Sequence, residues 1–490
     1  MEPEGVPSRR DVLKAGAAAA GLAAWGSFPA AAAGATEISG PTTITEPGDY
    51  VLTADIDVER GPAALDVTVS DVTIDGQGHT VSNVGGECIS VYRGANDVTV
   101  KNVRVSGERT GVVLVGDDAT LFNVLAEGNG GTGVRIIGGK RARIESCLLR
   151  ENGQYGLIGG DTQEYGSTDE ALVRACLVAD NGDAGLAFQR TTGVAVERCF
   201  VVGNGAAVRS LGDGVEFIGD TDDPRLADNQ LLSNAGCGVR GASRGVRGLN
   251  AVGNVVVDNE RFGFWLDNLY NADIKWNTFA RNEGGLEAYA TDSRVLHNQF
   301  VDDDFGGIYT DSTVRGNRII GGRMGGGDFI RSVVVENLVL GADDDGVSLV
   351  SMIDSEFGSN TVIGCGGDGV KTAQCYGCDV QWNTFSNNAE EGFSITWGSD
   401  STFKFNTVFG NGGDGLKLSA SEDEPGAFVV RKNTVSANGG VGILLRDAAG
   451  SRVTRNVVCA NDRGIAVSAP MDDVDPAELA ENVVEDNYVC

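Results

Sequence analysis

The sequence predicts an all-β solenoid, in which the chain winds into short stacked coils, and a strict repeat is the first evidence for it. Between residues 337 and 419 one pattern returns every 23 residues. Each repeat has an asparagine, an acid eight positions later, and then Gly and an apolar residue. The asparagines are Asn337, Asn360, Asn383 and Asn406, and the acids are Asp345, Asp368, Glu391 and Asp414. A fixed period of this length is typical of proteins in which each repeat is one turn stacked on the last.

The residues between the turns alternate in polarity, which indicates β-strands. Val347-Ser348-Leu349 and Phe393-Ser394-Ile395 place an apolar residue at every second position, as a half-buried strand does. No segment of this stretch keeps apolar residues at helical spacing for three turns. Glycine makes up 72 of the 490 residues, which is about twice the usual share of roughly 7%. That content suits a chain that turns every few residues.

A coil of three short strands and tight turns explains the length of the repeat. Such a coil uses about 23 residues and advances by one strand spacing, about 4.8 Å. Equivalent side chains then stack coil on coil. A buried asparagine at one corner can bond the turn backbone and the asparagines above and below it, which satisfies its amide group. Counted by this asparagine slot, the chain forms roughly eighteen coils.

The ten cysteines have two interpretations. Cys147, Cys176 and Cys199 take the asparagine slot on nearby coils, so we expect them to stack inside the solenoid as small apolar residues. Cys375-Tyr376-Gly377-Cys378, with Cys365 upstream, is the only group on a predicted loop. It could form a disulfide, a thiolate metal site or free thiols. A zinc site needs four ligands, and neither histidine is near in sequence, so the metal signal is weak.

The N-terminal segment is predicted to be a signal peptide rather than part of the fold. Ser8-Arg9-Arg10-Asp11-Val12-Leu13-Lys14 resembles the twin-arginine export motif, and Ala31-Ala32-Ala33 is a small-residue cleavage site. We therefore expect residues 1–34 to be a twin-arginine signal peptide and residues 35–490 to form the solenoid. The expected location is extracellular or at the cell surface. No other stretch is apolar enough to span a membrane.

The charge of the chain is strongly negative. There are 69 acids against 38 bases, a formal net charge of −31, and only 8 of the bases are lysines. An acid excess with scarce lysine is typical of halophilic proteins, because high salt screens the self-repulsion of such a surface. An ordinary acidic secreted protein is the alternative. Nucleic acid is excluded as a partner in either case, because there is no basic stripe to neutralise phosphates.

Two N-terminal segments carry a family resemblance. Pro47-Gly48-Asp49-Tyr50-Val51-Leu52 and Val72-Thr73-Ile74-Asp75-Gly76-Gln77-Gly78-His79-Thr80 resemble the opening coils of pectin-lyase-like proteins, which are built from PbH1 repeats. They look most like the NosD-like, carbohydrate-binding and sugar-hydrolysis subgroup, which includes copper-processing accessory proteins of nitrous oxide reductase. The resemblance implies a single-stranded right-handed parallel β-helix over essentially all of the mature chain. It also implies that His79 has a structural role in a turn.

One outward face of the predicted solenoid collects residue types that bind sugars. The residue after each inward apolar one should point outward, and so should the residue two further on. One outward row should therefore include Glu216, Arg240, Trp265, Lys371, Ser394 and Lys417. Trp265, Tyr289 and Tyr309 would then offer flat platforms on which sugar rings stack, although packing under a loop is an equal alternative. The predicted substrate-binding residues are Trp265, Glu287, Tyr289, Tyr309, Asp311, Arg331 and Lys417.

The ladder of acids beside this face is the candidate catalytic centre. Carboxylates one coil apart would be about 4.8 Å apart and those two coils apart about 10 Å, which brackets the separations in retaining and inverting glycosidases. A hydrolase would pair Asp368 with Glu391 or Asp345, one as acid and one as nucleophile or base. A lyase would use Lys371 as base, with calcium acidifying the proton beside a uronic acid carboxylate.

Four acids at this spacing raise one another's pKa unless a cation intervenes. Lys371 and Lys417 could neutralise them. Calcium is the other candidate, because it accepts several carboxylates at once, and its predicted ligands are Asp345, Asp368, Glu391 and Asp414. The alternative is that these acids belong to ordinary solvent-exposed Asp-Gly turns and form no functional site.

Three functions remain open at this point. The first is a secreted protein that binds polysaccharide or glycoconjugate and processes it in a lyase-like or hydrolase-like groove. The second is a non-catalytic cell-envelope scaffold or adhesion solenoid. The third is a copper-site accessory protein, which is disfavoured because the chain has only His79, His297 and four methionines, whereas copper favours imidazole and thioether ligands. The chain lacks the histidine signatures of pectin hydrolases and the Asp-Pro-His motif of alginate epimerases.

Overall fold

The computed structural model describes residues 33–160, 167–205, 212–242, 245–420, 426–468 and 483–490. The predicted twin-arginine motif lies outside the described residues. Within them every regular element is a β-strand and none is a helix, so the all-β class is confirmed. The chain divides into two compact units, unit 1 (Met1–Asn268) and unit 2 (Leu269–Cys490). The single solenoid domain over residues 35–490 stays a prediction, and each unit is described by itself.

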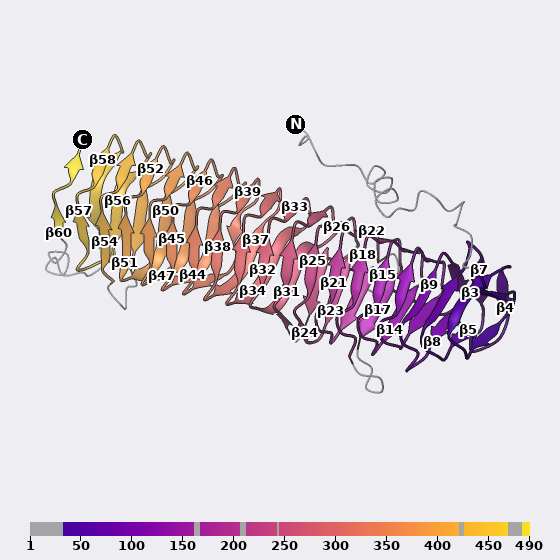
Figure 1. Cartoon of the computed structure of the whole chain (residues 1–490). Helices are drawn as coiled ribbons and strands as arrows, with labels where there is room; N and C mark the ends of the chain where they lie inside the picture. The colour runs from indigo at the N-terminus through magenta and orange to yellow at the C-terminus, as the bar shows by residue number, and fades with distance from the viewer. Residues whose placement is uncertain (1–32, 161–166, 206–211, 243–244, 421–425, 469–482) are drawn as a thin grey trace. The chain divides into compact units, whose positions relative to one another are not determined.

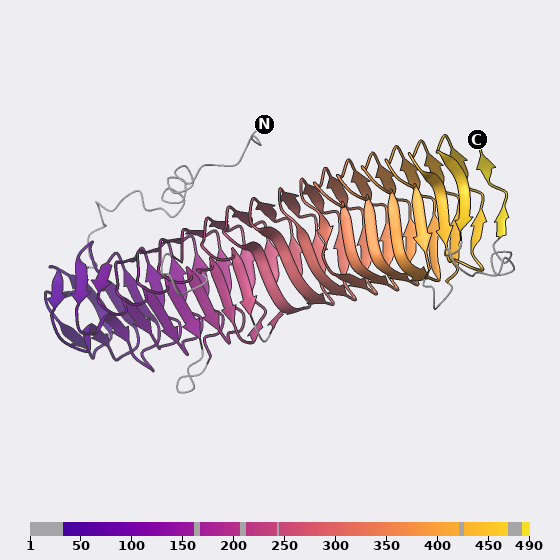
Figure 2. The ribbon, with the colours of Figure 1, turned by 180° about the vertical axis from the view of Figure 1, so that it is seen from behind.

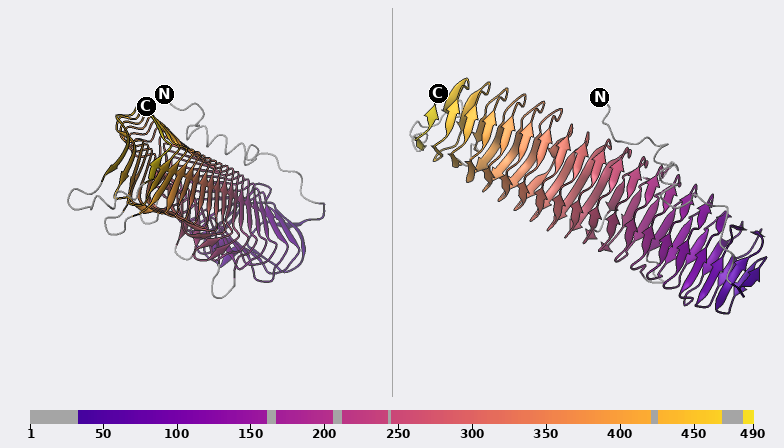
Figure 3. Two further views of the ribbon diagram at one scale, coloured as in Figure 1. Left: turned by 90° about the vertical axis from the view of Figure 1, so that its left-hand side faces the viewer. Right: turned by 45° about the horizontal axis from the view of Figure 1, so that its top comes forward.

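Each unit consists of short parallel strands in three sheets, called A, B and C (Figures 1 and 2). The chain passes from sheet A to sheet C to sheet B and returns to sheet A one coil later, as β45, β46, β47 and β48 do in turn. In the right-hand view of Figure 3 the orange and yellow strands of unit 2 lie side by side. The two units together hold about 18 turns, as the repeat predicts.

In unit 1 the strands have the following bounds. Sheet A contains β1 (Thr36–Ile38), β3 (Gly48–Leu52), β6 (Val72–Asp75), β9 (Val98–Lys101), β12 (Thr120–Phe122), β15 (Arg143–Glu145), β18 (Leu172–Arg174), β21 (Ala195–Glu197), β25 (Arg225–Ala227) and β29 (Asn250–Val252). Sheet B contains β2 (Thr42–Ile44), β5 (Ala63–Val67), β8 (Glu87–Val91), β11 (Val112–Leu114), β14 (Val134–Ile137), β17 (Leu157–Gly160), β20 (Leu186–Gln189), β23 (Val215–Ile218), β24 (Thr221–Asp222), β27 (Val239–Ala242), β28 (Val246–Arg247) and β31 (Phe262–Tyr270). Sheet C contains β4 (Ile56–Val58), β7 (Thr80–Asn83), β10 (Arg104–Gly107), β13 (Leu125–Glu127), β16 (Leu148–Arg150), β19 (Leu177–Ala179), β22 (Phe200–Val202), β26 (Gln230–Leu232) and β30 (Val255–Val257).

In unit 2 the strands have the following bounds. Sheet A contains β32 (Asp273–Lys275), β35 (Arg294–Leu296), β38 (Thr313–Arg315), β42 (Val333–Val335), β45 (Glu356–Gly358), β48 (Asp379–Gln381), β51 (Ser401–Lys404), β54 (Phe428–Arg431), β57 (Arg452–Thr454) and β60 (Val483–Glu485). Sheet B contains β34 (Gly284–Thr291), β37 (Phe305–Thr310), β40 (Met324–Gly325), β41 (Asp328–Ile330), β44 (Val347–Ile353), β47 (Val370–Tyr376), β50 (Phe393–Ser399), β53 (Leu416–Ser419), β56 (Val441–Arg446) and β59 (Arg463–Ser468). Sheet C contains β33 (Thr278–Ala280), β36 (Gln299–Val301), β39 (Arg318–Ile320), β43 (Leu338–Leu340), β46 (Thr361–Ile363), β49 (Thr384–Ser386), β52 (Thr407–Phe409), β55 (Thr434–Ser436), β58 (Val457–Cys459) and β61 (Tyr488–Val489).

The strand register confirms that one sequence period is one coil. Val362 pairs with Phe385 in the next coil, and Phe385 pairs with Val408. All three side chains are buried, so every third strand adds the same inward column of apolar residues. The core of each coil is therefore filled by residues of that coil and its two neighbours.

The predicted corner asparagines form a buried ladder. Asn383 donates its backbone N–H and its side-chain amide to Oδ1 of Asn406, both at 3.0 Å. The same amide donates to the carbonyl oxygen of Phe357 in the preceding coil at 2.8 Å. Cys199 takes the slot before Asn229 and donates its N–H to Asn229 Oδ1 at 2.9 Å, and its thiol is buried. The buried positions expected for Cys147, Cys176 and Cys199 are thus confirmed.

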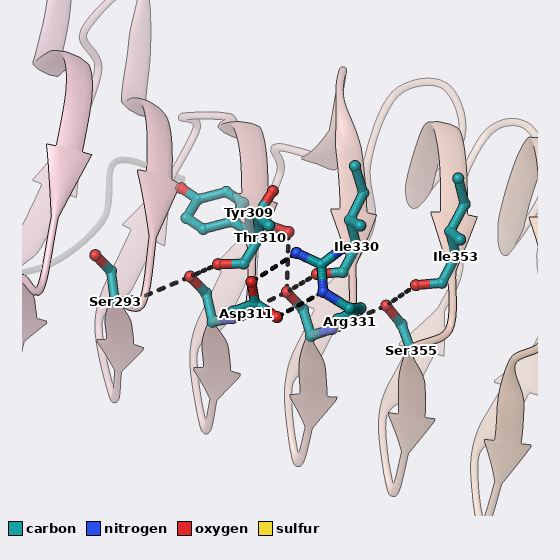
Figure 4. Close-up of polar contacts among 10 residues, drawn as sticks. Ser293, Tyr309, Thr310, Asp311, Ile330, Arg331, Ile353 and Ser355 are labelled. Carbon is teal, nitrogen blue, oxygen red and sulfur yellow. Dashed lines mark hydrogen bonds and ion pairs between the residues drawn. The ribbon is translucent and has the colours of Figure 1, made fainter.

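Two further ladders were not predicted. A second asparagine ladder lies five residues after the first, as Asn388 to Asn411 at 2.9 Å shows. A serine ladder stabilises the turn from sheet B to sheet A in unit 2 (Figure 4). There the backbone N–H of Ser332 donates to the hydroxyl of Ser355 at 3.0 Å, and the hydroxyl of Ser332 donates to the carbonyl oxygen of Ile330 at 2.9 Å.

A disulfide that the sequence analysis missed ties the last described coil of unit 2. Cys459, at the end of β58, is bonded to Cys490, which follows β61. The two Cα atoms are 4.6 Å apart and the residues are 31 positions apart in sequence. Because β61 pairs only with β58 among the described strands, this bond is a main attachment of that strand.

Asp303 provides a test of how the ladders tolerate charge. It accepts two hydrogen bonds from Asn282, at 2.7 Å from the backbone N–H and 2.6 Å from the side-chain amide. Burial raises the pKa of Asp303 to about 7 from an ordinary value of 3.8, although the bonds from Asn282 lower it. Its stabilising contribution is therefore complete below about pH 4 and is lost as the pH rises through about 7.

We expect Asp303→Asn to raise the denaturation midpoint at pH 8, because the substitution removes a buried charge. The gain should be about 2 to 4 kcal/mol at pH 8 and should vanish toward pH 4. Urea denaturation of both proteins between pH 4 and pH 8 measures it. An equal offset at every pH would contradict the assigned pKa.

Reduction of the Cys459–Cys490 bond should loosen the last coil alone. Opening a loop of about 30 residues releases about 3 to 4 kcal/mol of chain constraint in the unfolded state. We expect faster amide hydrogen exchange in β60 and β61 after reduction, with exchange in β52 unchanged. A uniform increase over unit 2, or no change in β61, would contradict this role.

Candidate functional site

A groove on the sheet B face of unit 2 gathers many of the predicted catalytic residues. It has a volume of about 620 Å³ and lies over the consecutive strands β47, β50, β53 and β56. Its lining residues are Asp368, Lys371, Glu390, Glu391, Ser394, Ile395, Thr396, Trp397, Lys417, Ser419, Ala420, Arg446 and Asp447. The register pairs Lys371 with Ser394 and Ser394 with Lys417, so the predicted outward row is confirmed for these coils.

The acid ladder arises because an acid caps the backbone of the next coil. Oδ1 of Asp345 accepts the N–H of Asp368 at 2.9 Å, and Oδ1 of Asp368 accepts the N–H of Glu391 at 2.9 Å. The glycine after the acid is required by close backbone approach, because a Cβ on Gly369 would lie 2.5 Å from the carbonyl oxygen of Gly392. One carboxylate oxygen thus supports the fold, and the other is left for different partners.

The second oxygen of Asp368 lies among other carboxyl groups. Ligand atoms of Asp368, Glu390 and Glu391 all lie within 4.8 Å of one another. Asp368 Oδ2 accepts a hydrogen bond from the hydroxyl of Ser394. Glu391 Oε1 accepts one from Nζ of Lys417 at 2.6 Å. The arrangement holds two neighbouring acids in unequal surroundings, because only Glu391 has a cation in contact.

These surroundings drive the two pKa values apart. Burial raises the pKa of Asp368 to about 7, and the hydrogen bond and charge of Glu391 add to the rise. Burial also raises the pKa of Glu391, but the hydrogen bonds from Asp368 and Lys417 outweigh it, so its pKa lies below the ordinary value. Below about pH 7 the pair therefore carries one proton, which resides on Asp368.

Lys371 is held in its charged form. Desolvation lowers the pKa of Lys371, but the charges of Asp345 and Asp368 and a hydrogen bond to Asp345 raise it further than burial lowers it. Its Nζ lies 3.5 Å from Oδ2 of Asp345. Asp345 is thereby close to the site without lining the groove. Asp414 does not line it either, and its Oδ1 accepts the N–H of Val441 at 2.6 Å.

The predicted substrate-binding residues are spread over several places. Trp265 belongs to unit 1, where its ring lies under Arg261 at 5.0 Å and its indole N–H donates to Asp267 at 3.2 Å. Tyr289 is 46% exposed, and Glu287 is half-buried two residues before it. Of the predicted set, only Lys417 lines the groove.

The expectation that Tyr309 faces outward is wrong. Its side chain is 1% exposed, and its hydroxyl donates to the carbonyl oxygen of Gly306 at 3.1 Å. The coil from β34 to β37 advances by only 19 residues, because Glu287 pairs with Gly306 and Ala290 with Tyr309. Spacing by the longer period assigned Tyr309 to the outward column, whereas the short coil moves its ring into the core.

Asp311 and Arg331 contact each other rather than the groove. They lie at the turn from sheet B to sheet A, where Arg331 donates two hydrogen bonds to Asp311, at 2.8 and 2.6 Å (Figure 4). The hydrogen bond and charge of Arg331 hold the pKa of Asp311 below its usual value. Both residues have positive φ, 50° and 47°, so they point from a corner and not from the strand face.

Three groove residues were missed by the sequence analysis. Glu390 directly precedes a ladder acid, and Arg446 ends β56. Trp397 is 47% exposed and lies beside Thr396, which is also exposed. Buried and exposed side chains alternate along β50 until this pair, where two exposed residues follow each other. In the sequence, Trp397 directly after the polar Thr396 is the signal that could have identified it.

Unit 1 contains a separate charged cluster on its own sheet B face. Arg240 forms ion pairs with Asp213 and with Glu216. Burial raises the pKa of Glu216 to about 6, although the charge of Arg240 lowers it. The register pairs Glu216 with Arg240 and Arg240 with Trp265, so the three residues share one column as predicted, although Glu216 is buried in it. The cation is fully engaged by its two acids.

The described cysteines outside the disulfide are all buried. Cys375 and Cys378 are free thiols in the structure, and the thiol of Cys378 donates to the carbonyl oxygen of Met352 at 3.1 Å. No cysteine belongs to a group of three metal-ligating side chains among the described residues.

Comparison with known families places the chain in one of them. The family described as right handed beta helix region matches residues 87–254 and 325–477, which is more than half of the chain. The protein belongs to this right-handed β-helix family, and the predicted handedness and family resemblance are confirmed. A second family, described as periplasmic copper-binding protein (NosD), matches residues 217–324.

Solved structures with the same type of fold include an alginate lyase, an alginate epimerase and a tailspike protein. A mutant of the PL6 family alginate lyase AlyGC is 10% identical, with a TM-score of 0.33 and 93% of this chain and 96% of that chain covered. A mutant of the periplasmic alginate epimerase AlgG is 12% identical, with a TM-score of 0.31 and coverage of 73% and 78%. The Dettilon tailspike protein is 13% identical, with a TM-score of 0.31, and the match covers 72% of this chain and 58% of the tailspike. No curated protein matches the chain.

The copper named by the second family does not fit the residues present. In residues 217–324 the imidazole and sulfur donors are Cys237, His297 and Met324. Cys237 and Met324 are buried, and His297 stacks on Trp276 with ring centroids 4.4 Å apart. Among the described residues of this stretch no three His, Cys, Asp or Glu ligand atoms converge.

A search of the described residues also finds no helix long and apolar enough to cross a membrane.

Calcium remains a prediction for the groove, with a revised ligand set. Asp368, Glu390 and Glu391 converge, whereas Asp345 and Asp414 do not join them. If this cluster holds calcium, as the lyase interpretation requires, Glu390→Gln should lower the affinity for Ca²⁺ about tenfold or more, because one of three carboxylates is lost. Asp414→Asn is the matched control and should leave the affinity unchanged. Equal effects of the two substitutions in calorimetry would contradict this site.

Proposed function

We propose that the protein is an exported glycoside hydrolase that cleaves a polysaccharide or glycoconjugate in the sheet B groove of unit 2. The observation that carries this proposal is the neighbouring pair Asp368 and Glu391, of which one is protonated and the other ionised near neutral pH. Glycoside hydrolysis requires two carboxyl groups in those two states. Export is supported by the twin-arginine-like motif around Arg9 and Arg10.

The spacing of the pair favours the retaining reaction. Retaining enzymes hold their carboxyl groups about 5 to 5.5 Å apart, whereas inverting enzymes need about 6.5 to 9.5 Å to admit a water molecule. The oxygens of Asp368 and Glu391 that approach each other lie within 4.8 Å. That separation lies below the range that inverting enzymes use, so it favours direct attack of the ionised group on the sugar.

The roles follow from the surroundings of each acid. Glu391 would attack the anomeric carbon, and Asp368 would give its proton to the leaving glycosidic oxygen. A covalent glycosyl ester on Glu391 results. Asp368, now ionised, would take a proton from water, and the hydroxide would hydrolyse the ester and restore Glu391. Lys417, 2.6 Å from Glu391, keeps that group ionised before the attack.

Neighbouring groove residues suit the binding of a sugar. The exposed ring of Trp397 offers a flat apolar platform against which a pyranose ring can stack. Ser394, Ser419 and Arg446 add hydrogen-bonding groups along the same groove. A few polar groups around an aromatic surface are typical of small concave binding sites.

A lyase is the second candidate, and the carboxyl cluster that could hold calcium favours it. Its weakness is the base. Lys371 would have to be neutral to abstract a proton, but the charges of Asp345 and Asp368 raise its pKa above the ordinary value. A bound cation would also displace the proton that Asp368 retains. A non-catalytic scaffold is the outcome if no glycan is cleaved.

We expect Asp368→Asn and Glu391→Gln to separate the two roles. Loss of a general acid costs about 10² to 10⁴ in rate, but an aryl glycoside with a good leaving group needs no proton. Asp368→Asn should therefore retain activity on dinitrophenyl glycosides and lose it on polysaccharide. Glu391→Gln should lose both. Release of dinitrophenol and of reducing sugar, across a panel of glycosides, measures the two activities.

Glu336→Gln is the matched control, because Glu336 pairs with Arg315 far from the groove residues in the register. It should retain wild-type rates. The wild-type rate on polysaccharide should fall above about pH 7, where Asp368 loses its proton. Unsaturated products, detected by their ultraviolet absorbance, would identify a lyase instead, and absence of any cleavage would leave the scaffold.

A further inference from the structure

We propose that a second site, on the sheet A side of unit 2, binds anionic sugars. It combines an aromatic ridge, Trp382 and Phe405, with a pocket of unpaired cations around Arg431 and Arg455. The inference names a substrate class and so rests in part on the proposed function, but it concerns different residues on a different sheet.

The ridge and the pocket share one column of corner residues. Trp382, Phe405, Lys432 and Arg455 occupy the same corner on successive coils, with φ of 59°, 58°, 56° and 56°. Each directly precedes a ladder asparagine. The N–H of Trp382 donates to the carbonyl oxygen of Lys404 at 3.2 Å, and the N–H of Lys432 donates to that of Thr454 at 3.2 Å. Side chains in this column are therefore neighbours one coil apart, about 4.8 Å.

Bulky aromatic residues are unfavourable in this conformation. A left-handed backbone costs an L-residue roughly 1 to 2 kcal/mol, and Asn, Asp or Gly tolerate it better. Trp382 is nevertheless there, 58% exposed. Its ring stacks on Phe405 with centroids 4.3 Å apart and planes 5° from parallel. Lys432 Nζ lies 5.1 Å from the Phe405 ring centre. The result is a flat, exposed surface that continues into positive charge.

The adjoining pocket has a volume of about 350 Å³ and is rich in cations. Its lining residues are Val429, Arg431, Lys432, Arg452, Thr454, Arg455, Glu485 and Asp486. The register pairs Val429 with Arg452 and Arg431 with Thr454, so β54 and β57 form its floor. All four cations are exposed. Two acids line the same pocket, and positive charge remains in excess.

This excess contrasts with several other places in unit 2. There a cation pairs with an acid one coil away, as Arg294 does with Asp273 at 2.5 Å and Arg331 with Asp311 at 2.6 Å. Within the part of the chain that the structure describes, none of the four pocket cations forms such an ion pair. In a protein with a net charge of −31, a pocket lined by four cations and two acids favours an anionic partner.

The chemistry of the patch selects a glycan among anions. Arginine forks bind carboxylate and sulfate in two-point contacts, and an exposed aromatic stack binds the apolar face of a sugar ring. An oligosaccharide of uronate or sulfated sugars carries both features along its length. A long nucleic acid would meet the strongly negative remainder of the surface and be repelled.

The test measures binding of full-length protein in a Glu391→Gln background, so that no ligand is consumed. Calorimetry compares oligogalacturonate, dextran sulfate and neutral dextran, and the first two distinguish carboxylate from sulfate recognition. We expect one or both anionic glycans to bind and neutral dextran to bind at least tenfold more weakly. Arg431→Gln with Arg455→Gln should weaken anionic binding about tenfold or more, and Trp382→Ala should weaken it severalfold.

Two matched controls isolate the patch. Trp276→Ala removes an equally exposed tryptophan, at 61%, with the same corner conformation and its own stacking partner, His297. Arg323→Gln removes an exposed arginine that is paired with Asp304 at 3.1 Å. Both should retain wild-type affinity. Equal losses in these controls, equal binding of neutral dextran, or equally tight binding of single-stranded DNA would overturn the proposal.

Because binding is measured without turnover, absence of hydrolysis by the wild-type protein would not affect the result. Conversely, if the second site does not bind anionic glycans, cleavage of small aryl glycosides still tests the hydrolase groove independently.

Discussion

Backbone pairing between successive coils is the constraint on which the rest of the structure depends. Each strand pairs in parallel with its equivalent one period later, as Val362 does with Phe385, so one slot in the repeat becomes one column in space. Inside the solenoid, this stacking gives each buried asparagine its hydrogen-bond partners. Asn383 donates to Asn406 Oδ1 in one neighbouring coil and to a backbone carbonyl oxygen in the other. Cys199 or Asp303 can enter such a column only with the hydrogen bonds that the neighbouring coil supplies.

The same stacking explains why the groove acids differ from the other acids of the surface. Several acids meet a base one coil away, as Asp273 meets Arg294, and such pairs keep both charges. In the groove the column brings Asp368 to Glu391 instead, and like charges at that distance retain a proton. A local arrangement that opposes simple charge pairing is typical of functional sites.

Corner positions give the fold its freedom to vary at the surface. Their left-handed conformation is imposed by the turn and by hydrogen bonds to the next coil, so the side chain can be Asp311, Arg331 or Trp382 without change to the path of the chain. An aromatic and cationic ridge can therefore be built on one column while the buried asparagine beside it keeps its bonds. The cost of the strained backbone is met by the packing of the whole coil.

The repeat predicted the sheets, the inward columns and the asparagine and cysteine ladders, because these follow from equal spacing alone. It also assigned Lys371, Ser394 and Lys417 to one row, where the coils keep the 23-residue period. The assignment failed for Tyr309, where the coil shortens to 19 residues. Glu390, Trp397 and the Cys459–Cys490 bond were missed because none of them repeats. By itself the sequence determined which residues face inward, since period and polarity are local properties. Only the tertiary structure decided which outward side chains meet and which acid keeps its proton, because those depend on coil length and on burial by neighbouring coils.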